Sequence, residues 1–238
     1  MTWLWPICFS LLLAQPAASA VVTGSVSLID SLLPAVRKHL DYSGVVVWLE
    51  PLGASPQVAS SARHVTMEQK GKSFVPHILA IQAGTLVSFP NVDPIFHSAF
   101  SNFNGQIFDL VLYAPGTDRT ITFRRTGVVR VFCNIHPTMS AVIVVLKYPW
   151  FAVSDAKGAF NIPNVPPGSY RLCLFHERTA TGTVRDLERE VEVTETGLAL
   201  PSLTISETGY VASPHKNKYG NEYAPGADER SDYPADRK

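Results

Sequence analysis

The run Cys133-Asn134-Ile135-His136-Pro137-Thr138-Met139 places a thiol, an imidazole and a thioether three residues apart on one short segment. A second imidazole, His97, lies upstream in a strand-rich region. Thiolate and thioether sulfurs favour Cu(I), whereas imidazole also suits Cu(II), and two His, one Cys and a weak axial Met hold the copper of blue-copper electron-transfer sites. These four side chains therefore predict one type 1 copper ion, which changes oxidation state with little rearrangement.

The elements predicted around these side chains bring them together. A β-branched run at 128–132 predicts a strand that ends at Cys133, and a second run at 141–146 begins just after Met139. The connecting loop is short enough to wrap three side chains around one point. Taken singly, each side chain would be an ordinary core residue; their joint arrangement favours a metal site.

Other metal chemistries fit these residue types poorly. Structural zinc prefers four Cys or His ligands, and a binuclear copper centre needs a second cysteine in the loop, which holds only Cys133. The neighbours of Cys133 are Phe132 and Asn134, whereas multicopper oxidases place histidines there, and the sequence has no His-x-His pair. Four filled ligand positions leave none open for a substrate, so we do not expect an enzyme.

Residues 62–147 are similar to the cupredoxin family, and the ligand spacing matches its amicyanin members. The family motif is a G-T-x-V-x-F-x-N segment, a His soon after it, and C-x-x-H-x-x-M, which here are residues 84–91, His97 and residues 133–139. The resemblance implies that His97, Cys133 and His136 bind copper and that Met139 is the long axial ligand.

The resemblance also assigns roles around the ligands. Asn91 matches an Asn that pins the ligand loop by hydrogen bonds in many cupredoxins. Ser98 departs from the Asn that commonly follows the first His, so we expect a weaker tie between the two ligand loops, which leaves the redox potential open but not the metal. By the same analogy, electrons leave through the solvent-facing edge of His136, and a redox partner docks there transiently on a small apolar rim. The oligomeric state stays open.

The sequence predicts an all-β chain. Short strand signals separated by glycines and prolines are typical of a sandwich or Greek-key barrel. We therefore expect a Greek-key cupredoxin β-barrel or sandwich plus a second small β-sandwich, with a disordered tail over 207–238, where Val211 is the only aliphatic residue larger than Ala.

The second sandwich resembles the carboxypeptidase-regulatory, transthyretin-like family. Its D-x-x-G-x-F-x-I pattern begins at Asp155, and a P-P-G-x-Y turn ends at Tyr170. The usual opening strands of such a sandwich would come from residues 21–60, so we predict a copper domain at 61–147 inserted between 21–60 and 148–206. A simpler division, with a cupredoxin at 21–147 and a sandwich at 148–206, stays open.

The ends and the composition indicate where the protein works. Residues 1–20 carry an apolar run and the small-x-small site Ala18-Ser19-Ala20, which predict a signal peptide and export, with the periplasm as the expected destination. No stretch has the roughly 20 apolar residues of a membrane span. The 20 basic and 20 acidic side chains leave no basic surface for nucleic acid.

Three functions remain open at this point. The first is an exported carrier of single electrons by Cu(I)/Cu(II) cycling. The second is a periplasmic protein that binds, sequesters or delivers copper. The third is a structural or interaction β-sandwich protein with a vestigial metal site.

Overall fold

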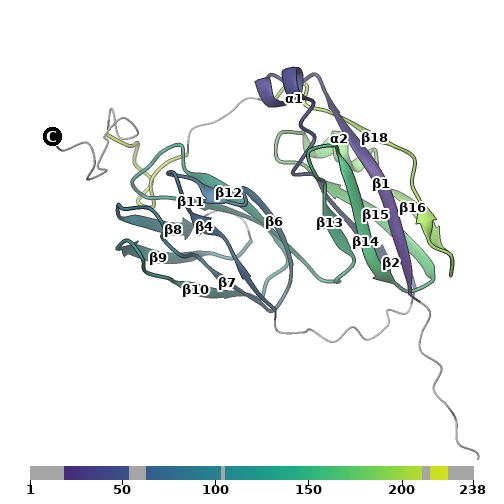
Figure 1. The fold of residues 1–238 in the computed structure, drawn as a ribbon, viewed down its shortest axis with the longest axis horizontal. Helices are drawn as coiled ribbons and strands as arrows, with labels where there is room; N and C mark the ends of the chain where they lie inside the picture. The colour runs from purple at the N-terminus through teal and green to yellow at the C-terminus, as the bar shows by residue number, and fades with distance from the viewer. Residues whose placement is uncertain (1–18, 54–62, 103–104, 211–214, 225–238) are drawn as a thin grey trace, which may run out of the picture.

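The computed structural model describes residues 19–53, 63–102, 105–210 and 215–224, which form two β-sandwiches lying side by side (Figure 1). The predicted all-β class is confirmed, because only two short helices, α1 (Pro34–His39) and α2 (Thr181–Arg185), occur in these ranges. None of the helices in the described ranges is both long and apolar enough to cross a membrane. The predicted signal peptide lies outside the described residues except at its end, where Ala20 begins the first strand.

The first sandwich contains the candidate metal ligands and is built from two sheets with a small ladder beside them. The five-stranded sheet has the order β6 (Ile78–Gln82), β12 (Ser140–Leu146), β11 (Gly127–Phe132), β8 (His97–Ser101) and β9 (Phe108–Tyr113). The three-stranded sheet is β10 (Thr120–Phe123), β7 (Thr85–Ser88) and β3 (His64–Thr66), and the ladder is β4 (Glu68–Gln69) with β5 (Phe74–Val75).

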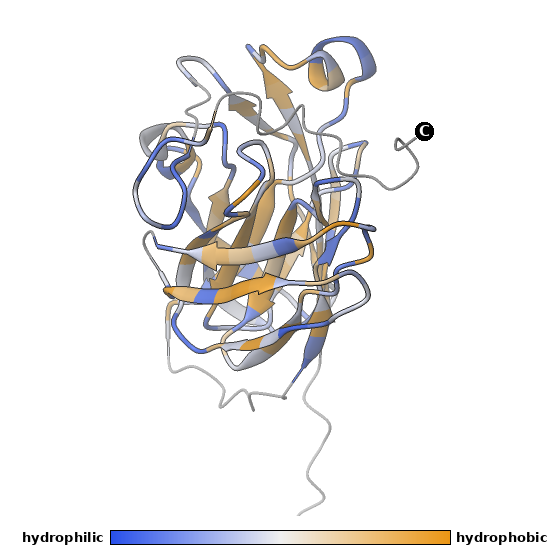
Figure 2. Cartoon of the chain, turned by 90° about the vertical axis from the view of Figure 1, so that its left-hand side faces the viewer, coloured by the Kyte–Doolittle hydropathy of each residue, from blue (hydrophilic) through white to orange (hydrophobic). Residues whose placement is uncertain are grey.

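The core of the first sandwich lies between these sheets. Side chains alternate between the two faces of a strand, so Val129 and Val131 of β11 point into the core, where both are fully buried. They join Val87 and Phe123 of the smaller sheet in one cluster. Burying each such side chain contributes about 1.5–3 kcal/mol. Figure 2 shows that the hydrophobic residues gather on the strands and the hydrophilic ones mainly in the loops.

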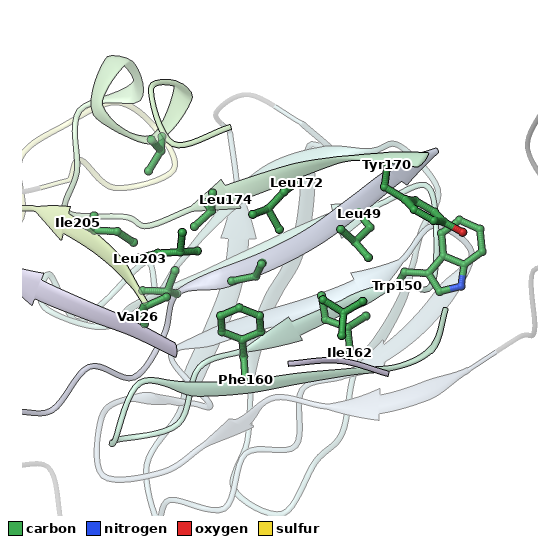
Figure 3. Close-up of a cluster of buried hydrophobic side chains, with 14 of the residues drawn as sticks. Val26, Leu49, Trp150, Phe160, Ile162, Tyr170, Leu172, Leu174, Leu203 and Ile205 are labelled. Carbon is green, nitrogen blue, oxygen red and sulfur yellow. The ribbon is translucent and has the colours of Figure 1, made fainter. Parts of the chain in front are cut away.

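The second sandwich also has two sheets. The first has the order β14 (Ala159–Val165), β1 (Ala20–Ile29) and β17 (Leu198–Ala199), with β18 (Leu203–Ser206) also paired to β1. The second sheet is β13 (Phe151–Val153), β2 (Val46–Pro51), β15 (Gly168–Phe175) and β16 (Arg189–Val193). Figure 3 shows their shared core, which Trp150 and Tyr170 close at one end with their ring planes at 80°.

Strands from both ends of the chain share this second sandwich. β1 and β2 precede the first sandwich in sequence, yet β1 pairs with β14, and β2 pairs with β13 and β15. Gly158 allows the turn before β14 to approach β1 closely: it has a φ of 79°, and a Cβ there would overlap the carbonyl oxygen of Val26. The first sandwich thus begins and ends between two segments of the second.

The two sandwiches share an apolar interface. Val142, Val144 and Leu146 of β12 pack with Val46 of β2 in a separate buried cluster. Both faces of β12 are therefore covered, one by its own core and the other by the second sandwich, which explains its continuous apolar run. This strand directly follows the loop that carries Cys133 and His136, so the second sandwich covers the strand at one end of that loop.

The prediction of an exposed tail from residue 207 onward is wrong in two places. Glu207 is only 3% exposed, because its carboxylate accepts hydrogen bonds from Ser31 and Arg178 and contacts His176. Residues 215–224 lie against the loop that carries Cys133. The composition gave no sign of these contacts, because polar contacts hold Glu207, and hydrogen bonds with one ring stack hold residues 215–224. Residues 211–214 and 225–238 lie outside the described ranges.

His77 and Glu177 form an ion pair between the two sandwiches. His77 Nε2 lies 2.9 Å from Glu177 Oε1, and its Nδ1 lies 3.0 Å from the carbonyl oxygen of Ser140. The hydrogen bond to Glu177 is the main cause that raises the pKa of His77 above its usual value. Burial opposes ionisation of Glu177, but the hydrogen bond from His77 and nearby positive charges outweigh it and lower the pKa of Glu177.

This ion pair predicts pH-dependent stability. Its contribution is complete above the unfolded pKa of 4.5 for Glu177 and below that of 6.5 for His77, and it is lost as pH rises through the raised pKa of His77. At about pH 5.5, we expect His77→Gln to lower the free energy of unfolding by up to about 1 kcal/mol, since the pair is partly exposed. The deficit should shrink at about pH 8.5.

Denaturant unfolding at both pH values measures this effect. His39→Gln, which removes an exposed imidazole from α1, is the matched control against which the deficit of His77→Gln is read at each pH. An equal deficit for His77→Gln at both pH values would contradict the assignment.

Candidate metal centre

Three of the four predicted ligands meet at one end of the first sandwich. His97 is the first residue of β8, Cys133 directly follows β11, and His136 lies in the loop between β11 and β12. Cys133 Sγ lies 3.6 Å from His136 Nδ1 and 4.0 Å from His97 Nδ1, and the ligand atoms of the three residues lie within 4.8 Å of one another. All three residues are buried, so the chain presents a convergent set of donors.

The fourth predicted ligand, Met139, closes the loop. Its carbonyl oxygen accepts a hydrogen bond from the amide of Cys133 at 3.0 Å, and its own amide donates to the carbonyl oxygen of His136 at 3.1 Å. Met139 is 1% exposed and packs in the same core cluster as Cys133. These two bonds close the loop within seven residues and hold the backbone of Met139 beside that of Cys133.

The sulfur of Cys133 is stabilised as an anion. Burial alone would raise the pKa of this thiol, but hydrogen bonds from the His136 and His97 rings and from the backbone of Ile135 lower it to about 5. Cys133 is therefore a thiolate near neutral pH, the form of cysteine that binds metals.

Asp93 orients the ring of His97 from the side opposite the thiol. His97 Nε2 lies 2.8 Å from Asp93 Oδ2, which leaves Nδ1 facing Cys133. Burial disfavours the charged carboxylate, but the amides of Lys72 and Gly71 and the ring of His97 hold the pKa of Asp93 below its usual range. Burial likewise opposes protonation of His97, yet Cys133 and Asp93 together raise its pKa.

Asn91 fixes the loop that leads to His97. This fully buried side chain donates to the carbonyl oxygen of Ile95 at 2.8 Å and accepts from the amide of Asp93 at 3.1 Å. It therefore holds the backbone on both sides of the turn before His97. Asn91 was expected to pin the ligand loop, and the bonds of its side chain lie in the segment that leads to His97.

Ser98 ties the two ligand loops together. Its hydroxyl oxygen accepts a hydrogen bond from the amide of Asn134 at 2.8 Å and lies 3.8 Å from Cys133 Sγ. A serine is thus long enough to join β8 to the Cys133 loop. Although the Ser98 side chain is shorter than that of asparagine, it still connects the two loops.

His136 is only 4% exposed, whereas we expected an edge of its ring to face solvent. Exposed apolar side chains lie in the same loops: Val92 and Phe96 precede His97, and Ile135 precedes His136. They are 51%, 52% and 36% exposed, respectively.

Asp93 was not predicted from the sequence as the hydrogen-bond partner of the candidate ligand His97. The available signal was its position four residues earlier in the same loop, since metal-binding histidines commonly donate their second ring N–H to a carboxylate. His176 contacts Glu207, and His77 contacts Glu177; neither belongs to the metal centre.

No family model matches the chain, and no curated protein matches it. Among solved structures, it is similar to a copper-containing nitrite reductase from Thermus scotoductus SA-01, at 25% identity and a TM-score of 0.35, over 52% of this chain and 28% of the reductase. Amicyanin from Paracoccus versutus matches at 20% identity and a TM-score of 0.33, over 41% of this chain and 97% of amicyanin.

A purple cupredoxin from Nitrosopumilus maritimus matches at 22% identity and a TM-score of 0.31, over 35% of this chain and 99% of that protein. The chain thus spans only about a quarter of the nitrite reductase but nearly all of the two smaller proteins. TM-scores this low carry no weight in assigning a function, which depends on the side chains of the site.

The low pKa of Cys133 predicts a titration in the metal-free protein. Thiolate ultraviolet absorbance should persist at neutral pH and disappear as pH falls through about 5. Cys133→Ser should abolish this absorbance. Cys173→Ser should leave it unchanged, because burial raises the pKa of Cys173 to about 12 and keeps that thiol protonated. A midpoint above pH 8 would show that the imidazoles do not stabilise the sulfur anion.

Proposed function

We propose that this chain is a type 1 copper protein that carries single electrons. The observation that carries the proposal is the buried convergence of Cys133 Sγ with Nδ1 of His97 and His136. A thiolate and two imidazoles, with the thioether of Met139 on the same loop, match the donor set that copper prefers in both oxidation states. The support comes from this donor chemistry and from the cupredoxin-like motif.

The surroundings of the donors suit electron transfer. Bound copper would supply the Cu(I)/Cu(II) couple, with Met139 proposed as its long axial ligand. Asp93, Asn91 and Ser98 hold the ligand side chains in place by hydrogen bonds, which keeps rearrangement between the two states small. The four ligands leave no open position for a substrate, so we propose that the protein is not an enzyme.

The surface around the ligand loops suits a transient partner. Phe96, Val92 and Ile135 expose apolar side chains on the loops that hold His97 and His136. Interfaces in redox encounters are small, often below about 1,200 Å². We propose that a redox partner docks on this rim near His136, and that the protein is exported to the periplasm, as its N-terminal sequence suggests.

For the domain organisation, we propose that a cupredoxin at 61–147 is inserted into a sandwich made of residues 21–60 and 148–206. The pairing of β1 with β14 and of β2 with β15 supports this division over the one that assigns residues 21–60 to the copper domain. Assignment of the sandwich to the carboxypeptidase-regulatory family is a proposal that depends on its sequence motifs alone.

Copper loading tests the function. We expect the protein to bind one Cu(II) with strong visible absorption, which His97→Ala and Cys133→Ala should each abolish. Met139→Leu should keep the colour and raise the reduction potential. A reversible voltammetric couple would support electron transfer, whereas rapid loss of copper to an acceptor would favour delivery. Failure to bind Cu(II), or an unchanged spectrum in Cys133→Ala, would overturn the proposal.

A second prediction concerns the carboxylate behind His97. Asp93→Asn should weaken Cu(II) binding by about 10- to 100-fold, because the carboxylate orients the imidazole and raises its basicity. Competition against a chelator of known affinity measures this change. Asp118→Asn removes the same charge from an exposed position in the same sandwich and is the matched control. Equal affinities for the two variants would show that Asp93 has no influence on the metal.

A further inference from the structure

Residues 215–224, near the C-terminus of the chain, lie against the loop of the first sandwich that carries Cys133. In Figure 1 the yellow C-terminal segment lies beside β8 and β11, far from β18 in the other sandwich. The hydroxyl of Tyr223 donates a hydrogen bond to the carbonyl oxygen of Cys133 at 2.6 Å. The residue proposed as the central copper ligand is therefore in direct contact with a segment about 90 positions later.

The peptide group between Cys133 and Asn134 is held on both sides. Tyr223 binds its carbonyl oxygen, and the hydroxyl oxygen of Ser98 in β8 accepts from its N–H at 2.8 Å. Both polar groups of this peptide thus pair with residues outside the loop. Rotation of the peptide would break one bond or the other, so the two contacts fix the backbone from which the Cys133 side chain extends.

Further contacts hold the segment in place. The amide of Lys218 donates to Oδ1 of Asn134 at 2.9 Å, and its ammonium group lies 2.8 Å from Asp109. The ring of His215 stacks on Phe132, the last residue of β11, with centroids 4.2 Å apart and planes at 28°. The Lys218–Asp109 pair is partly exposed and contributes little. The hydrogen bonds and the ring stack therefore provide most of the attachment.

We propose that residues 215–224 act as a clamp on the Cys133 loop, with Tyr223 as the positioning residue. The clamp keeps the thiolate oriented toward the two imidazoles and slows opening of the loop. The effect of the clamp on copper rests on the proposed function. If Cys133 binds copper, an opening of its loop that moves the thiolate away would also release the metal. The clamp itself can be measured without metal.

Amide hydrogen exchange of the full-length, metal-free protein tests the clamp. Tyr223→Phe removes the hydroxyl that bonds Cys133 and contacts His215 Nδ1, and it keeps the ring, so the Asn134 amide should exchange about three- to tenfold faster. Tyr219→Phe removes a hydroxyl from the same segment, where the residue is 73% exposed, and should leave the rate unchanged. His215→Ala should act in the same direction as Tyr223→Phe by removing the stack on Phe132.

Copper loss provides a second readout. After loading with Cu(II) and reduction with excess ascorbate, the Tyr223→Phe variant should lose Cu(I) to an excess of a Cu(I) chelator about three- to tenfold faster than the Tyr219→Phe variant. Equal exchange rates for Asn134 in the two variants would overturn the clamp, even if both bind copper. Faster exchange in Tyr223→Phe, in a protein that binds no copper, would support the clamp while contradicting the copper function.

Discussion

The burial of a negatively charged sulfur is the constraint on which the candidate metal centre depends. A thiol buried without suitable partners resists ionisation, as Cys173 shows, where burial raises the pKa to about 12. Cys133 is buried even more completely, yet its pKa is lowered to about 5, because two imidazoles and a backbone amide surround the sulfur. The same residue type in the same chain thus has opposite chemistry: hydrogen-bond donors surround Cys133, whereas burial and the negative charges of Glu50 and Glu188 act on Cys173.

The rest of the first sandwich keeps these donors in place. β8 carries His97 beside β11, which delivers Cys133, and Ser98 joins the two segments at their ends. Asp93 and Asn91 fix the turn before His97. On the other side of the loop, β12 is packed against the second sandwich. The second sandwich thereby has a physical role, since it covers the outer face of the strand that leaves the site.

The local part of this arrangement could be predicted from the sequence. Cys133, His136 and Met139 occupy one short loop between two strongly β-branched runs, and the structure places strands at both runs. β8 was not predicted, because all five of its residues are buried and the sequence shows no alternation. Asp93 was overlooked although it is close in sequence to His97. The Tyr223 contact had no signal, since the hydrogen bond joins segments about 90 residues apart within a polar, charged stretch.

X-ray absorption spectroscopy of the copper-loaded protein tests the central claim most directly, because it reports the atoms bound to the metal. We expect one short copper–sulfur bond together with two copper–nitrogen bonds from imidazole, in both the oxidised and the reduced protein, with little change between them. A copper shell of nitrogen and oxygen alone, without the short bond to sulfur, would contradict it.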